Sequence, residues 1–222
     1  MTLENKNKVE LLGYYGSDLV IAQSAWTSTS RDLTQDKLDR VPALLEMLWT
    51  NGHETPFEKA NVHFLVNCDI ASHIHLLKHR IASINAESAR YKELKEDKYY
   101  LPEDWIGIKE QDDEYPEHQD DWFTKLKDFT EYSNRLYHQC LEELTPVLGR
   151  KRAKESARFF KTYNSQIAAD VQFNMRSFAN FLKLRSSEHA QVEIRDIAQQ
   201  MYDLVANIEG SPFKETLKWI KP

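Results

Sequence analysis

Three short segments of this 222-residue chain alternate apolar and polar side chains, and long stretches of helical periodicity separate them. Alternation of this kind puts every second side chain on one face, as in a half-buried strand. The segments cover residues 8–12, 60–68 and 167–173. Since the stretches between them are unequal and show no repeated βαβ rhythm, the pattern predicts an α+β fold rather than a doubly wound sheet.

Apolar residues spaced by three and four predict the helices between these strands. The first helix opens at Gly16-Ser17-Asp18, and Asn51-Gly52 supplies a left-handed cap for the second. Phe129 is expected on the inner face of a later helix, and residues 81–100 show no regular pattern. After the first, the predicted helices cover residues 34–50, 69–80, 122–144, 146–160, 176–187, 189–208 and 212–220.

The composition is that of an ordinary globular protein, with 41% hydrophobic and 29% charged residues. No apolar run approaches the ~20 residues that span a bilayer, and the N-terminus lacks the apolar core of a signal peptide. We therefore expect a cytoplasmic protein, or one of the host cytoplasm if the chain is viral, with no membrane partner. The net charge of −6 argues against general affinity for nucleic acid.

A single domain is expected over residues 1–222, with the strongly acidic residues 103–121 as an exposed excursion on its surface. The two cysteines, Cys68 and Cys140, fall at apolar positions of predicted elements and belong to no CxxC motif. They are interpreted as reduced, buried thiols, although a catalytic thiol is the alternative. No neighbouring residue that would lower a thiol pKa stands beside either of them.

The densest group of polar residues covers positions 78–91, KHRIASINAESARY. Two interpretations are open for its basic residues. They lie either in the last turn of a helix, where cations complement the helix dipole, or in a loop that binds an anion. In the second interpretation Arg80 and Arg90 supply planar forks for phosphate oxygens. Ser88 and nearby backbone N–H groups then complete the cradle.

Two further groups have the same two interpretations, a solvated surface or a binding site. In residues 174–185, Asn180 and Lys183 share a helix face with Arg176, where they can read the edge of a heterocycle and hold a diphosphate. Residues 53–58, HETPFE, form either a plain loop or a pocket mouth that carries an imidazole and a carboxylate.

Metal and nucleotide motifs of other classes are missing from the sequence. His75 and His79, like His189 and Glu193, stand at i and i+4, a spacing that can bind zinc, but no third ligand accompanies either pair. We therefore predict no metal site. The sequence also contains no GxGxxG, GxxxxGK[ST], HExxH or GxSxG motif.

Taken in order, the three polar groups resemble the signatures of the flavin-dependent thymidylate synthase family (ThyX) over about residues 9–205. The family's RHR, seven residues and Ser is similar to Lys78-His79-Arg80 followed by Ser88. HETPFE matches a second hallmark, and NxRSxxNFLxLR…HAQxEIR over 174–195 matches a third. Arg158 falls where the family has another phosphate-binding arginine.

The resemblance implies a small, mostly antiparallel sheet flanked by helices, and a homotetramer with shared active sites. It implies an enzyme that makes dTMP from dUMP with FAD as cofactor and with 5,10-methylenetetrahydrofolate and NADPH as co-substrates. The implied catalytic residues are His53, Ser88 and Arg185. The implied FAD residues are Thr55, Glu58, His79, Arg80, Ile81, Asn85, Asn174, Arg176, Asn180 and His189. The implied dUMP residues are His75, Lys78, Ser88, Arg90, Arg158 and Arg185.

The chemistry implied by the resemblance suits these residue types. Methylation of uracil at C5 needs a nucleophilic carbon, and a guanidinium that stabilises negative charge on the N3/O2/O4 edge provides one without a thiol. Arg185 is the candidate for this role, and the reduced flavin supplies the hydride.

Four positions depart from the family pattern: His75 for Gln, Lys78 for Arg, Ala86 for Gln or Glu, and Lys59 for His. Three of them surround the expected dUMP site, so a hydroxymethylase that acts on a deoxypyrimidine monophosphate is an alternative function. A nucleotide-binding homologue without activity is another, and a sequence-specific nucleic-acid binder is the least favoured.

Overall fold

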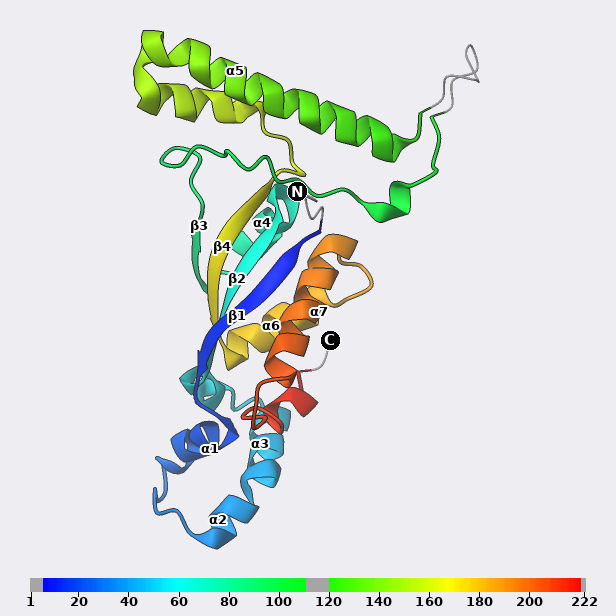
Figure 1. Cartoon of the computed structure of the whole chain (residues 1–222). Helices are drawn as coiled ribbons and strands as arrows, with labels where there is room; N and C mark the ends of the chain where they lie inside the picture. The colour runs from blue at the N-terminus through cyan, green and yellow to red at the C-terminus, as the bar shows by residue number, and fades with distance from the viewer. Residues whose placement is uncertain (1–5, 111–119, 221–222) are drawn as a thin grey trace. The chain divides into compact units, whose positions relative to one another are not determined.

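The computed structural model describes residues 6–110 and 120–220 (Figure 1). Contacts divide the chain into two compact units. The first holds the N-terminal residues up to Asn7 with 67–74 and 86–168, and the second holds 8–66, 75–85 and the chain from Ala169 onward. The single domain over residues 1–222 stays a prediction.

A four-stranded antiparallel sheet in the order β1-β2-β4-β3 is the centre of the fold. Figure 1 shows the strand directions alternating across it. The strands are β1 (Lys8–Tyr15), β2 (Asn61–Asp69), β3 (Ser83–Ala86) and β4 (Gln166–Asn174). The three strands predicted from alternation are confirmed, and the α+β class with them.

β3 corrects the expectation that residues 81–100 are irregular throughout. This strand has only four residues, too few for an alternating pattern to be recognised. Its pairing with β4 defines it, since the backbone N–H of Glu87 donates to the carbonyl of Ala168 immediately after the strand. A strand made by a partner more than 80 residues away in sequence leaves no local signal.

The core lies between the sheet and two C-terminal helices, α6 (Met175–Arg185) and α7 (Val192–Ala206). Phe173 of β4 and Phe64 of β2 are fully buried against Phe178 and Phe181 of α6. The Phe173 ring lies 5.2 Å from that of Phe181, and the Phe64 ring 5.8 Å from that of Phe178. Burial of each such ring contributes about 1.5–3 kcal/mol, so this contact fixes α6 on the sheet.

The predicted helix over 34–50 is in fact two helices, α2 (Gln35–Asp39) and α3 (Val41–Thr50), which corrects the prediction. They separate at Arg40, just before Pro42. A proline has no N–H and its ring clashes with the carbonyl four residues earlier, so one continuous helix is excluded here. Gly52 has φ +70°, which confirms the predicted left-handed cap. α1 (Asp18–Trp26) precedes this pair.

Helix α5 (Trp122–Ala157) spans both of the helices predicted over 122–144 and 146–160. The break lies at Gly149, with φ 77° and ψ 149°, and not at Pro146. Only glycine adopts this backbone conformation at low cost, and Figure 1 shows α5 folding back on itself.

One residue of the inner face predicted for this helix is placed wrongly: Phe129 is 60% exposed, whereas its neighbour Thr130 and also Asn134 and Tyr137 are buried. Hydrogen bonds explain the difference. The Tyr137 hydroxyl accepts the Leu94 N–H at 3.0 Å, and the other two buried residues also have polar partners. Apolar periodicity does not detect a helix face of this kind.

The remaining elements are short, and the helix predicted over 212–220 is wrong, since only a 3₁₀ turn of three residues forms there. α4 (Ile70–Leu77) stops before Lys78, so 78–82 are free of helix. The 3₁₀ turns are η1 (Thr55–Lys59), η2 (Glu103–Trp105), η4 (Arg158–Phe160) and η5 (Thr216–Lys218). Of the acidic excursion 103–121, residues 111–119 lie outside the described chain, and most of the others are exposed. None of the helices within the described chain has the length and apolarity that crossing a bilayer requires.

A buried carboxylate holds the C-terminal segment in the second unit. Asp18, at the start of α1, accepts hydrogen bonds from the backbone N–H groups of Glu215 and Thr216, and from the Thr216 hydroxyl at 2.6 Å. Asp18 is only 9% exposed and Thr216 is fully buried. Because Thr216 is fully buried, its two donors would stay unsatisfied without this side chain, so the position of Thr216 depends on Asp18.

We predict that Asp18→Ala lowers the free energy of unfolding by about 2–3 kcal/mol, because the buried donors that the aspartate accepts from lose their hydrogen-bond partner. Urea denaturation followed by circular dichroism measures the change. Glu46→Ala is the control, because Glu46 is exposed on α3. Equal stability of the two variants would contradict the role given to Asp18.

Candidate active site

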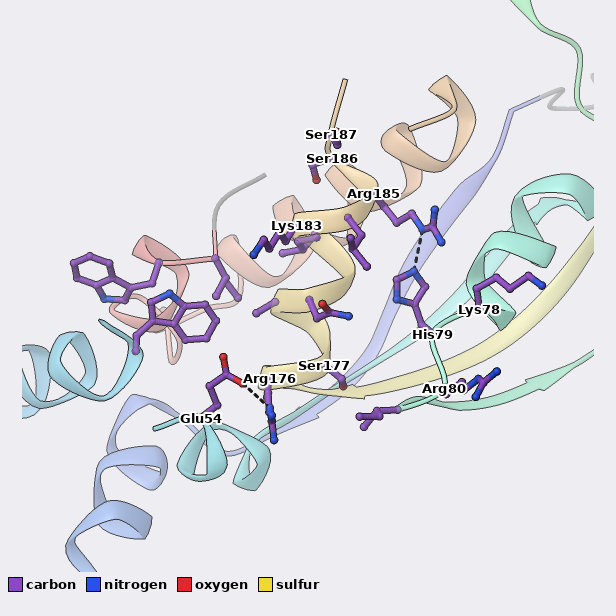
Figure 2. A pocket seen from close by; sticks show the side chains of 18 residues that line it. Glu54, Lys78, His79, Arg80, Arg176, Ser177, Lys183, Arg185, Ser186 and Ser187 are labelled. Carbon is purple, nitrogen blue, oxygen red and sulfur yellow. Dashed lines mark hydrogen bonds and ion pairs between the residues drawn. The ribbon is translucent and has the colours of Figure 1, made fainter. Parts of the chain in front are cut away.

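The second unit contains a cavity of about 950 Å³ that follows helix α6 (Figure 2). Four chain regions form its walls: Trp49 and Glu54, the segment between α4 and β3, helix α6 with the residues just after it, and Trp219 with Ile220. The lining residues are Trp49, Glu54, Lys78, His79, Arg80, Ile81, Arg176, Ser177, Ala179, Asn180, Leu182, Lys183, Leu184, Arg185, Ser186, Ser187, Trp219 and Ile220.

Asn174 sets the start of α6 and thereby the position of its polar side chains. Its side-chain oxygen accepts the N–H of Ser177 at 2.8 Å, which is an N-cap hydrogen bond. Arg176, Asn180 and Lys183 then follow at helical spacings of four and three, so they lie on one face of α6. This shared face is the one predicted from the sequence.

Two carboxylates fix Arg176. Its Nε donates to Glu54 at 2.7 Å, and a terminal nitrogen donates to Glu58 at 2.7 Å. These hydrogen bonds, that to Glu58 first, raise the pKa of the Arg176 guanidinium. The group carries five N–H donors in a planar fork, so further donors remain for a ligand.

Arg185 has a neutral partner instead. Its Nε donates to Nε2 of His79 at 2.9 Å, as Figure 2 shows, although the two residues are 106 positions apart. An imidazole accepts at Nε2 only when it is neutral and protonated on Nδ1. The imidazole is buried, 8% exposed, with its ring edge-on to Phe181 at 5.0 Å between centroids.

Burial, together with the charges of Arg185 and His75, lowers the pKa of His79 to about 4. At neutral pH the imidazole is therefore uncharged and remains an acceptor. A neutral acceptor does not offset the positive charge of the Arg185 guanidinium, and within the described residues its terminal N–H groups have no carboxylate partner.

Positive charge predominates in the cavity. Lys78, Arg80, Lys183, Arg176 and Arg185 line it, against the single carboxylate of Glu54. Within residues 6–110 and 120–220, Lys78, Arg80 and Lys183 make no ion pair. A concave surface with unpaired cations attracts an anionic ligand such as a phosphate ester.

The structure brings seven of the predicted site residues to this cavity: Lys78, His79, Arg80, Ile81, Arg176, Asn180 and Arg185. Among the others, Glu58 holds Arg176 and Asn174 caps α6. Asn85 is in β3, His75 is near the end of α4, and His189 is exposed between α6 and α7. Their roles stay predictions.

His53 and Thr55 line a separate cavity of about 510 Å³, with α1 and α3 as its other walls. Ser88, Arg90 and Arg158 belong to the first unit. There the Nε of Arg90 donates to Glu155 at 3.0 Å, and Arg158 is exposed in η4. The catalytic and nucleotide-binding roles of these five residues also stay predictions.

Trp49 and Trp219 were not predicted, although both line the cavity. Neither belongs to the motif groups, and 170 positions separate them, so no local pattern joins them. The role of Glu54 as a partner of Arg176 was also missed. The only signal for it was the pair of acidic residues in HETPFE.

The two cysteine thiols do not line the cavity. Cys68 is fully buried in β2, and burial together with the neighbouring Asp69 raises its pKa. Cys140 packs against the cluster around Tyr137 in the first unit. Neither cysteine lines the cavity, and no group of three possible metal ligands occurs within the described residues.

Several known proteins are similar to this chain in both amino-acid sequence and fold. A family model described as "Thymidylate synthase complementing protein" matches residues 10–209. The flavin-dependent thymidylate synthase of Pseudothermotoga lettingae is 34% identical over 89% of this chain and 85% of its own length. The chain belongs to the flavin-dependent thymidylate synthase family, a family of methyltransferase enzymes.

Two further relatives agree with membership of this family. The flavin-dependent thymidylate synthase of Thermotoga neapolitana is 33% identical over 97% of this chain and 89% of its own length. A solved structure of the UMP/dUMP methylase PolB from Streptomyces cacaoi, bound with 5-Br dUMP, has a TM-score of 0.74 and 25% identity. The match covers 99% of this chain and 96% of that one, which confirms the predicted family fold.

We predict that His79 titrates at about pH 4, and that its pKa rises in the variant Arg185→Ala, because one of its neighbouring positive charges is gone. Burial persists in the variant, so the pKa stays below the ordinary value. NMR titration of the imidazole resonances measures both values. If His79 of the unmodified protein titrated at the ordinary pKa of an imidazole, the conclusion that Arg185 has a neutral partner would be contradicted.

Proposed function

We propose that this enzyme methylates dUMP reductively to dTMP, with FAD as cofactor, 5,10-methylenetetrahydrofolate as carbon donor and NADPH as reductant. It works as a cytoplasmic homotetramer. The observation that carries the proposal is the Arg185–His79 hydrogen bond inside a cationic cavity, in a chain of this family. The pair offers a positioned positive charge where the reaction needs one.

The residues of the cavity fit FAD. The volume of about 950 Å³ lies within the usual range for ligand pockets. Among the residues that the structure describes, Arg80 and Lys183 have no ion-pair partner and are suited to phosphate oxygens. Arg176 keeps donors beyond the two that its carboxylates use. When bound, the reduced flavin supplies the hydride that completes the methyl group.

Arg185 activates the pyrimidine in this proposal. A guanidinium hydrogen-bonded to the N3/O2/O4 edge stabilises the negative charge that develops there as C5 attacks the one-carbon unit. His79 holds the Nε side of the guanidinium, so its orientation is set before substrate arrives. Preorganised charge of this kind is worth more in a site that excludes water.

The 5′-phosphate of dUMP needs cations of its own. Lys78, which is unpaired within the described chain, supports this role with a single ammonium. Arg90, Arg158 and Ser88 are proposed as further phosphate-binding residues, in active sites that the subunits of the homotetramer share, and Arg90 then exchanges its Glu155 partner for the phosphate. Binding energy from the phosphate then fixes the uracil ring at the reacting centre.

Hydroxymethylation is the second candidate, and the specific observation behind it is Lys78. Lysine keeps the positive charge but lacks the bidentate fork of arginine. A phosphate that has one hydrogen bond fewer at this position orients the nucleotide less strictly, which leaves room for water to quench the exocyclic methylene. Mass spectrometry separates the two: the product exceeds dUMP by CH₂ after methylation and by CH₂O after hydroxymethylation.

We predict that Arg185→Ala lowers turnover of dUMP by at least about 100-fold, the usual cost of removing a group that stabilises transition-state charge. Flavin absorbance of the purified variant stays close to normal. Tritium release from [5-³H]dUMP, in the presence of FAD, methylenetetrahydrofolate and NADPH, measures turnover. Arg31→Ala is the matched control, since Arg31 is exposed and does not line the cavity. Full activity of Arg185→Ala would remove the mechanism.

We predict that Lys78→Arg preserves or tightens dUMP binding, because the planar fork adds a second hydrogen bond to the phosphate. Equilibrium binding of dUMP to the flavin-loaded protein, with UMP measured alongside, gives the affinities. A large loss of affinity for dUMP would show that the site is built around lysine.

A further inference from the structure

Residues 87–98, which we call the strap, follow β3 in the chain, belong to the first unit and carry Ser88 and Arg90. The carbonyl of Ser88 accepts the N–H groups of Tyr91 at 3.0 Å and Lys92 at 2.9 Å, so the backbone makes a tight turn there. The hydroxyl of Ser88 lies next to the Arg90 backbone, whose N–H it accepts at 3.4 Å. The strap is described over its whole length and contains no helix or strand, so contacts to other elements must hold it in place.

The start of the strap is fixed to β4. The Glu87 N–H donates to the carbonyl of Ala168 at 2.9 Å, and the Glu87 carboxylate accepts the Ala168 N–H at 2.9 Å. The same carboxylate pairs with Lys92 at the other end of the turn. Residue 87 is therefore placed by the sheet.

The middle of the strap is held by exposed contacts to the second half of α5. The Nε of Arg90 donates to Glu155 at 3.0 Å. A terminal nitrogen of Arg150 donates to Glu93 at 2.8 Å. The side chains of Arg90 and Arg150 are 45% and 63% exposed, and ion pairs in contact with water stabilise a fixed conformation only slightly. These two contacts alone do not fix the strap.

A buried lysine fixes the end of the strap. Lys161 follows η4, and its side chain is only 4% exposed. Its ammonium donates to Asp97 at 2.7 Å and to the side-chain oxygen of Asn134 at 2.7 Å. It also lies 4.4 Å from the centroid of the Tyr137 ring, a distance suited to a cation–π contact. Because a charge in the interior is stable only with partners of this kind, Lys161 holds all three of them in place.

Asp97 has a backbone conformation that its partners impose. Its φ is +48°, which a residue other than glycine keeps where the surrounding structure determines it. Its second carboxylate oxygen hydrogen-bonds to Nε2 of His138 at 2.8 Å. Three positions earlier, the N–H of Leu94 donates to the Tyr137 hydroxyl at 3.0 Å. Since Lys161 contacts both Asp97 and Tyr137, one side chain joins the two points that fix this end of the strap.

We propose that Lys161 is a positioning residue for nucleotide binding. By fixing the end of the strap it leaves only residues 88–93 between two anchored ends, which keeps Ser88 and Arg90 in the arrangement that binds a phosphate. A short segment with fixed ends has few conformations, so little ordering entropy is lost when the ligand binds. The inference rests on the proposed function, in which these two residues bind the 5′-phosphate of dUMP. Lys161 belongs to none of the motif groups of the sequence.

The variant Lys161→Met tests this role, since methionine is unbranched and packs against the Tyr137 ring without a charge. We expect the affinity for dUMP to fall by about 10- to 100-fold, the usual effect when groups that position a substrate are displaced slightly. The affinity for deoxyuridine, which has no phosphate, stays unchanged. Calorimetric titration of the flavin-loaded, full-length protein with each ligand measures both affinities.

Lys127→Met is the matched control, because Lys127 is an exposed lysine of α5 in the same unit. The double variant Lys161→Met/Asp97→Asn covers the case that Lys161→Met does not fold, because it removes both members of the ion pair together. Asparagine also tolerates a positive φ. If Lys161 acts through Asp97, the double variant loses as much dUMP affinity as the single variant and no more.

A loss of affinity for dUMP but not for deoxyuridine, in variants that thermal denaturation shows to be folded, supports the inference. Unchanged dUMP affinity in a folded Lys161→Met or double variant, or an equal loss for dUMP and deoxyuridine, overturns it. A merely structural role would weaken both ligands alike. The proposed function fails separately: if dUMP binding depends on Lys161 but the unmodified protein releases no tritium from [5-³H]dUMP, the positioning role is retained and the reaction is not.

Discussion

The pairing of β4 with both β2 and β3 is the constraint on which the site depends. β4 continues directly into α6, and the Met175 N–H at this junction donates to the carbonyl of Ala60, next to β2. On its other edge, β4 pairs with β3, which follows residues 78–82. Two stretches about 100 residues apart are therefore brought together, and the bond from Arg185 to His79 becomes possible.

Electrostatics then divides the cations of the cavity into two kinds. Arg176 is held by two carboxylates, which fix its direction while more than one N–H donor stays available. Arg185 is held by a neutral imidazole, so its charge is not compensated. A carboxylate at the place of His79 would neutralise the guanidinium and weaken its effect on a developing negative charge. In the proposed function, the lowered pKa of His79 therefore matters for the reaction, because it keeps the partner of Arg185 uncharged.

The sequence predicted the parts of the fold whose signal is local. β1, β2 and β4 alternate strongly, and the cap at Asn51-Gly52 uses residue types with a known preference. β3 was not predicted, because its pairing with β4 and not its own sequence pattern makes it a strand. The buried polar residues of α5 were not predicted, because hydrogen bonds such as that between Tyr137 and Leu94 hold them in the interior and apolar spacing gives no sign of this.

The candidate site, like the fold, was predicted only where the signal is local in the sequence. Motif order pointed to Arg80, Arg176, Asn180 and Arg185, all of which line the cavity. It did not indicate which partner each arginine has, since Glu54 and His79 reach theirs across more than 100 residues. Trp219 belongs to no motif and joins the cavity only through the folded C-terminal segment.

The central claim is that positioned cations and a flavin replace a protein thiol in the methylation of uracil. Formation of dTMP by the double variant Cys68→Ala/Cys140→Ala tests it most directly, with FAD, methylenetetrahydrofolate and NADPH supplied. The account predicts turnover close to that of the unmodified enzyme, because neither cysteine lines the cavity. Loss of dTMP formation in a variant that is folded and still binds flavin would contradict it.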